Sequence, residues 1–118
     1  MKDSVLRDKS YAFAVRIVRM YQYLSKEKKE FVLSKQILRC GTSVGANIAE
    51  AGFAQSKADF IAKLSVAIKE ANETHYWLNL LRDTDYLDIP LFQSLEENIV
   101  EIRKLLTASL KTAKTNQS

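Results

Sequence analysis

Few residues of this chain belong to the types that catalyse reactions or bind metals. His75 is the only histidine and Cys40 the only cysteine in the 118 residues, and a tetrahedral zinc site needs a larger set of such ligands. Glu70 and Glu73 have the spacing of carboxylate ligands in helical di-iron proteins, but those sites need a Glu-x-x-His pair on each of two helices. Tyr76 stands where the histidine would have to be. The sequence predicts no metal site and no enzyme.

Neither the glycines nor the cysteine indicates a cofactor or a nucleophile. Gly41-x-x-x-Gly45 lacks the lysine and hydroxyl residue of a phosphate-binding loop and falls inside a predicted helix. Cys40 lies beside the predicted core face, so we interpret it as a buried structural thiol. A single cysteine fits a reducing compartment, and the N-terminal segment has acidic residues where a signal peptide needs an apolar run. We therefore expect a cytoplasmic protein without a cofactor.

The best candidate for a binding surface is a basic stripe on the first predicted helix. Wound at about 100° per residue, the chain brings five residues to one side, and two more extend the stripe on the second helix. These residues are Lys9, Arg16, Arg19, Tyr23, Lys26, Lys35 and Arg39. Cationic side chains neutralise phosphates and tyrosine stacks on bases, which predicts contact with RNA or DNA. A solvated face, or pairing with the acids of the third helix, is the alternative.

The charge is unevenly distributed along the chain. The net charge is +4, and residues 1–30 carry eight Lys/Arg against four Asp/Glu, whereas residues 56–88 carry four against six. This asymmetry favours either attraction of nucleic acid or pairing between helices and subunits.

Four amphipathic helices are needed to position these residues. Apolar residues recur with a helical period, and only three glycines and one proline interrupt the chain. No apolar run approaches the roughly 18 residues that span a bilayer. We predict a single all-α domain over residues 1–118, an up-down-up-down antiparallel four-helix bundle. Its helices are expected at about residues 4–25, 34–53, 57–84 and 90–112.

The predicted second helix has three different faces. One is apolar, one carries very small residues, and one is polar and includes Asn47 and Glu50. Glycine in a helix costs about 1 kcal/mol relative to alanine, so Gly41 and Gly45 indicate either close approach of another helix or a break in this one. Ser34 is the expected N-cap, and Ser56 to Asp59 resembles a capping box at the start of the third helix.

Residues 38–51, LRCGTSVGANIAEA, carry a recognisable pattern, and residues 56–64 and 69–78 carry a second. Together they resemble the bacterial four-helix-bundle family of proteins encoded by intervening sequences in the 23S rRNA gene, often labelled S23 ribosomal proteins. Many relatives have proline where this chain has Gly45 and glycine where it has Ala51. The chain therefore resembles a glycine-bearing branch of the family, and functions of the other branch transfer less safely.

The resemblance implies a homopentamer, a ring of bundles around a central channel. It also implies nucleic acid and a reverse transcriptase as partners, since relatives that serve diversity-generating retroelements bind both through basic surfaces. We assign helix or subunit packing to Gly41, Gly45, Asn47, Glu50, Glu70, Glu73 and Trp77. For the polar strip of the second helix, a structural network and the lining of a channel or groove both remain open.

These observations lead to two hypotheses of different classes. The first is a non-enzymatic homo-oligomeric bundle that binds RNA or DNA as an accessory or scaffold protein. The alternative is a protein-binding adaptor with no nucleic-acid role. Under either hypothesis we expect no membrane partner.

Overall fold

Four helices make up almost all of the computed structural model, which describes the backbone of residues 2–116 and the side chains of residues 5–116. The helices are α1 (Lys2–Lys26), α2 (Leu33–Ala51), α3 (Lys57–Asp83) and α4 (Ile89–Thr115). Their ends lie within three residues of the expected positions, and the described residues contain no strand. The predicted antiparallel four-helix bundle is confirmed.

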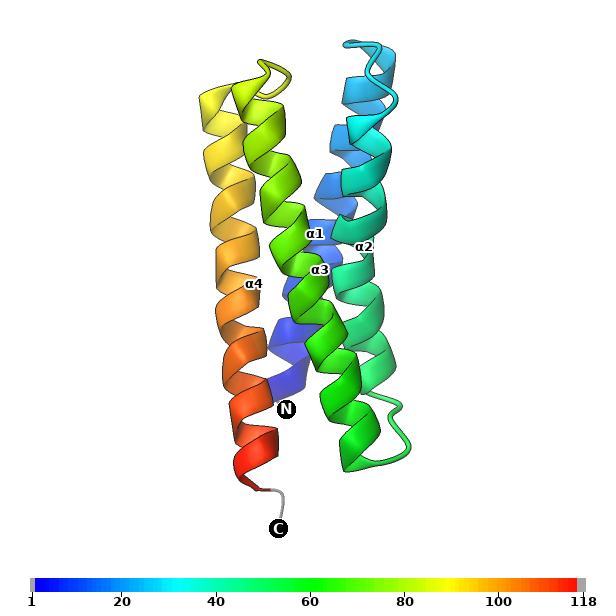
Figure 1. Cartoon of the computed structure of the whole chain (residues 1–118), viewed down its shortest axis with the longest axis vertical. Coiled ribbons are helices and arrows are strands. Elements are labelled where there is room, and N and C mark those ends of the chain that lie inside the picture. Colours follow the sequence, from blue (N-terminus) through cyan, green and yellow to red (C-terminus); the bar gives the residue numbers. More distant parts are fainter. Residues whose placement is uncertain (1, 117–118) are drawn as a thin grey trace.

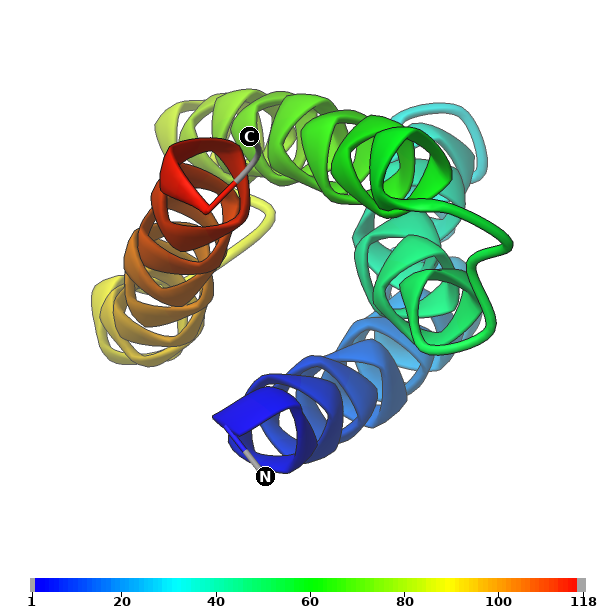
Figure 2. The ribbon, with the colours of Figure 1, turned by 90° about the horizontal axis from the view of Figure 1, so that it is seen from below.

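The helices form a rod of 51 × 21 × 20 Å. The α1–α2 and α3–α4 turns lie at one end, and the α2–α3 turn lies at the other end with the termini of α1 and α4 (Figure 1). Each helix packs on the next along the chain, and α4 returns to α1. The α1–α4 seam is the most loosely packed of the four, and Figure 2 shows this open side from the end of the rod.

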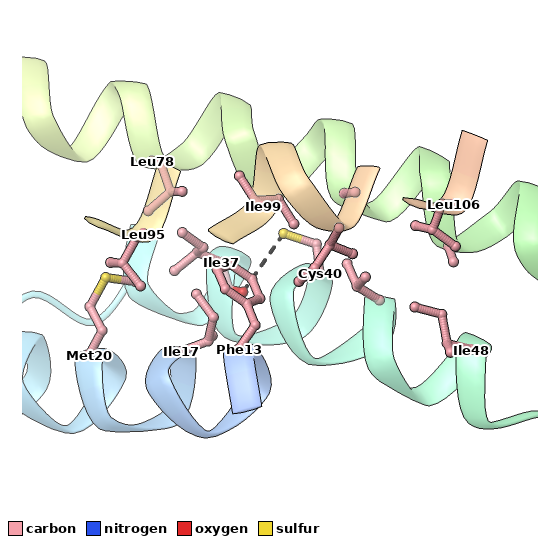
Figure 3. Packing of buried hydrophobic residues seen from close by; sticks show 14 of the residues in the cluster. Phe13, Ile17, Met20, Ile37, Cys40, Ile48, Leu78, Leu95, Ile99 and Leu106 are labelled. Carbon is pink, nitrogen blue, oxygen red and sulfur yellow. Dashed lines mark hydrogen bonds between the residues drawn. The ribbon is translucent and has the colours of Figure 1, made fainter. Parts of the chain in front are cut away.

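The core runs along the whole rod and contains the apolar residues that the helical period predicts (Figure 3). Phe13, Ile17, Ile37, Leu95 and Ile99 are almost completely buried. The polar residues that are buried among them satisfy their hydroxyl groups locally, by donating to backbone carbonyls of their own segment. The core therefore leaves few polar atoms that could bind a ligand.

The start of α2 differs from the prediction that Ser34 is its N-cap. The helix begins at Leu33. The residue at the N-cap position is Val32, whose side chain forms no capping hydrogen bond. The carboxylate of Glu30 instead accepts hydrogen bonds from the backbone N–H groups of three residues, at 2.7–3.1 Å. The Ser34 hydroxyl donates to the Glu30 carbonyl oxygen at 2.8 Å. Lys29, with φ of 54°, turns the chain so that Glu30 reaches this position.

The starts of α3 and α4 are capped by side chains. The Ser56 hydroxyl accepts a hydrogen bond from the Asp59 N–H at 3.0 Å, which confirms the predicted cap. The Asp88 carboxylate accepts one from the Leu91 N–H at 2.9 Å, with Pro90 in the first turn of α4, where its missing N–H is tolerated.

Helix α2 is continuous through both of its internal glycines. A Cβ atom on Gly41 would lie 3.0 Å from side-chain carbons of Ile17, and one on Gly45 would lie 3.2 Å from the backbone oxygen of Ser10. Both neighbours belong to α1, so these glycines are where α1 and α2 approach most closely. Of the two sequence-based interpretations, close approach is the one that the structure shows.

Candidate nucleic-acid interface

The first half of the basic stripe on α1 faces α4. Lys9 Nζ lies 3.3 Å from Glu101 Oε2, and Arg16 Nη1 donates to Asn98 Oδ1 at 2.6 Å. The acid that pairs with this part of the stripe therefore comes from α4 and not from α3. The Lys9 pair is well exposed, and such pairs contribute little stability.

The second half of the stripe remains exposed near the α1–α2 turn. Arg19 and Lys26 are exposed and form no ion pair with any residue in the range 5–116. The Tyr23 side chain is 41% exposed, and Lys28 Nζ lies 5.9 Å from the centroid of its ring. A cation at this distance is attracted by the ring face. This end of α1 thus combines free positive charge with an accessible aromatic ring.

 A shallow groove joins both halves of the stripe at the α1–α4 seam. The groove itself measures ≈ 230 Å³, and a separate groove on the outer face of α1 measures ≈ 340 Å³. Six residues line the seam groove: Arg16, Arg19, Met20, Tyr23, Leu91 and Leu95. Three of them belong to the predicted stripe, so the fold brings these three together at one site.

Arg39 lies on a different side of the bundle from the α1 residues of the stripe. Its guanidinium contacts Glu73 Oε2 at 2.6 Å and Glu70 Oε1 at 3.9 Å across the α2–α3 seam. The indole N–H of Trp77 donates to the same Glu73 oxygen at 3.1 Å. Lys35 is exposed near the start of α2. The structure thus places Arg39 in a packing cluster with Glu70, Glu73 and Trp77 of α3. Lys35 is exposed and forms no ion pair with residues 5–116.

The polar strip of α2 is bonded mainly to its own helix. Ser43 donates to the Arg39 carbonyl oxygen at 2.7 Å, and Asn47 donates to the Ser43 carbonyl oxygen at 2.8 Å. Glu50 is exposed at the end of the helix, directly before its last residue. Within the single chain these groups form short local contacts rather than a connected network.

The lone histidine and the lone cysteine have structural surroundings. His75 Nε2 lies 2.7 Å from Glu96 Oε2, and its Nδ1 lies 3.2 Å from Arg103 Nη1. His75 thus bridges α3 and α4 through both ring nitrogens. Cys40 is fully buried, and burial raises the pKa of its thiol. Across residues 5–116 no group of three or more potential ligand side chains could hold a metal.

The two turns at one end of the rod differ in charge. In the α1–α2 turn, Lys28 and Lys29 are balanced by Glu27 and Glu30, and the excess of positive charge comes from Arg19 and Lys26 of α1. The α3–α4 turn contains Asp85 and Asp88 and no basic residue. Figure 1 shows both turns at this end. Any anionic partner of the bundle will therefore be attracted to the α1 side of this end and repelled from the α3–α4 side.

Some of these features could not be found from sequence. The partners of His75 lie on α4, Glu96 about two turns and Arg103 about four turns after its start. No local spacing in the sequence links them to His75. Met20, Leu91 and Leu95 follow the helical period of the apolar residues, and this period does not indicate that they also line a groove. None of the helices described here has the length and apolar content of a membrane span.

Comparisons with known proteins agree with this architecture. The family model described as 23S rRNA-intervening sequence protein matches residues 2–108. A crystal structure of a protein of unknown function, from the S23 ribosomal protein family of Bacteroides thetaiotaomicron VPI-5482, is 58% identical in sequence and superposes with a TM-score of 0.93. The match covers 94% of this chain and 99% of that one. A search of curated proteins gave no match. The chain belongs to the 23S rRNA-intervening sequence protein family.

Proposed function

We propose that the protein is a non-enzymatic, homo-oligomeric bundle that binds RNA or DNA in the cytoplasm as an accessory or scaffold. The observation that carries this proposal is the exposed cationic end of α1. Arg19 and Lys26 are exposed beside Tyr23 without an intrachain ion pair among the described residues, so their charge is available to phosphates. Nucleic-acid backbones attract such clusters and release counterions on binding.

Reversing the charge of Arg19 and Lys26 together (Arg19→Glu/Lys26→Glu) is expected to weaken nucleic-acid binding by more than tenfold. Each lost phosphate contact also lowers the slope of log affinity against log salt, by roughly 0.7 to 0.9 per contact. Fluorescence anisotropy with labelled RNA and DNA across a salt series measures both effects. Arg16 is left unchanged because it bonds Asn98 across the α1–α4 seam.

The matched control is Lys69→Glu/Lys104→Glu, which changes the charge equally at exposed positions on α3 and α4. It is expected to keep most of the affinity and a similar salt slope. Binding that is absent at low salt, or that responds neither to salt nor to the α1 variant, would contradict the proposal.

Two exposed apolar surfaces support self-association. Tyr11 and Val18 lie on the outer face of α1, beside the groove of ≈ 340 Å³, whereas Val66 and Tyr76 are exposed on α3. These helices do not pack against each other in the chain, so the two surfaces point in different directions. A ring needs two such different, complementary surfaces on each subunit, and the family resemblance supports a pentamer.

The wild-type protein is expected to have about five times the 13.5-kDa mass of one chain in light scattering at micromolar concentration. Val18→Glu places a charge on the outer face of α1 and is expected to reduce the mass to that of one chain, because an unpaired charge is costly to bury. Thr107→Glu, at an exposed position on α4, is the control and should leave the mass unchanged. A single-chain mass for the wild type would refute self-association.

Exposed apolar side chains, among them Phe53, also favour a second candidate, a protein-binding adaptor. Phe53 in the α2–α3 turn is 86% exposed, and apolar surface of this kind marks protein contacts. A reverse transcriptase, which the resemblance implies, is one such partner. An association that survives nuclease treatment and high salt, together with absent nucleic-acid binding, would favour this candidate.

A further inference from the structure

The groove at the α1–α4 seam has the chemistry of a site for one nucleobase. Its apolar part is formed by Met20 and Leu95, which are buried, and by the half-buried Leu91. The guanidinium-bearing residues Arg16 and Arg19 line it as well. No carboxylate is among the lining residues. Leu91 and the Tyr23 ring therefore offer the accessible apolar surface of the groove, and the cationic side chains of Arg16 and Arg19 lie beside it.

Two contacts prepare the groove for such a ligand. Asn98 Oδ1 accepts a hydrogen bond of 2.6 Å from Arg16 and so holds this guanidinium in place at the seam. Lys28 Nζ lies over the Tyr23 ring at 5.9 Å from its centroid, which shows that a flexible cation can reach this ring. A stacked base can take the place of Lys28 over the ring and leave its ammonium group near the phosphate.

The groove excludes a base that remains in a duplex. Paired bases are stacked within the helix, and proteins reach their faces only in single strands, loops or flipped-out nucleotides. A duplex laid across this end of the rod would also approach the acidic α3–α4 turn, with Asp85 and Asp88, which lies at the same end as the α1–α2 turn (Figure 1). A single strand can follow the α1 side alone.

We infer that the seam groove binds one unpaired base of single-stranded RNA or DNA, with Tyr23 as the stacking residue and Arg16 and Arg19 beside the phosphates. This inference rests on the proposed function, of which it names the substrate class and the contact site. Stacking on Tyr23 makes the site selective for single strands over duplexes. It does not select among the bases, because every base has a π-face.

The test compares labelled 20-nucleotide single strands of oligo(dT) and oligo(U) with a blunt 20-base-pair DNA duplex, by fluorescence anisotropy at low salt. We expect the single strands to bind at least tenfold more tightly than the duplex. Tyr23→Ala should weaken single-strand binding by about 5- to 100-fold and leave duplex binding and the salt slope unchanged, because no charge is removed. The oligo(dT) and oligo(U) arms show whether the site distinguishes DNA from RNA.

Tyr23→Phe is the matched control, since it keeps the ring and should retain single-strand affinity within about twofold. Circular dichroism of both variants checks the fold. Both should keep the helical spectrum of the wild type, because the Tyr23 side chain is only partly buried. Equal binding of single strands and duplex, or full single-strand affinity in Tyr23→Ala, would overturn this inference. The proposed function would still hold in that case if binding depended on salt and on the α1 cations. Absence of all nucleic-acid binding would overturn both.

Discussion

Replacing Gly45 with leucine is expected to destabilise the bundle by about 3 kcal/mol, the upper part of the usual range for overpacking. A Cβ atom at this position lies 3.2 Å from the backbone oxygen of Ser10, and the rest of a leucine side chain would have to displace α1. Backbone cannot rotate away as a side chain can, so the helices must separate. Urea unfolding followed by circular dichroism measures the loss in the free energy of unfolding. All variants are compared at one protein concentration, because self-association shifts apparent stability.

Two further variants separate packing from helix propensity. Gly45→Ala gains about 1 kcal/mol of helix propensity and meets only the Cβ contact, so its stability should stay within about 1 kcal/mol of the wild type. Ala46→Leu adds the same side chain at the next, exposed position of α2 and should be nearly neutral. If Gly45→Leu were as stable as the wild type, close approach of α1 would not be the reason for this glycine.

Replacing Glu30 with alanine is expected to reduce stability by about 2 kcal/mol at pH 7, the upper range for loss of a helix cap. The Glu30 carboxylate accepts hydrogen bonds from three backbone N–H groups at the start of α2. These donors have no partner inside the helix, and water replaces the carboxylate incompletely. Chemical unfolding at pH 7 gives the difference, and Glu27→Ala, an exposed acid in the same connection, is the control.

The contribution of Glu30 depends on pH in a defined direction. Burial raises the pKa of this carboxyl, but the hydrogen bonds from the backbone N–H groups outweigh burial and lower its pKa below the ordinary value of 4.5. The folded state therefore binds the proton less readily than the unfolded state, and the stabilisation is complete above pH 4.5. It is lost as the pH falls through the folded-state pKa. The stability difference between wild type and Glu30→Ala should shrink over that range, and a constant difference would contradict this role.

The N-terminal cap of α2 was not predicted correctly by local sequence preferences. Ser34 is a favoured capping residue, and it precedes an apolar period, so the prediction followed the usual pattern. The structure uses Glu30 instead, because the left-handed backbone of Lys29 turns the chain and brings the carboxylate over the first turn. The cap at Ser56 needed no such turn, and there the prediction was confirmed.

The candidate site was predicted only as a stripe on one helix. Helical geometry correctly groups Arg16, Arg19 and Tyr23 on one side of α1, because residues three, four and seven positions apart share a face. It does not tell which neighbour faces that side. Arg16 meets Asn98 of α4, whereas Arg39 meets Glu73 of α3, and these distant partners divide the seven predicted contact residues between two sides of the bundle.

The sequence by itself determined the helices, their apolar faces and the family, because hydrophobic periodicity and the residue 38–51 pattern are local properties of the chain. The tertiary structure decided which faces meet, which cations remain free and where a groove opens. These features depend on residues far apart in sequence that packing brings together, such as Tyr23 and Leu91 at the α1–α4 seam. The loose packing of that seam, which no single helix encodes, is the physical reason that a groove lies there.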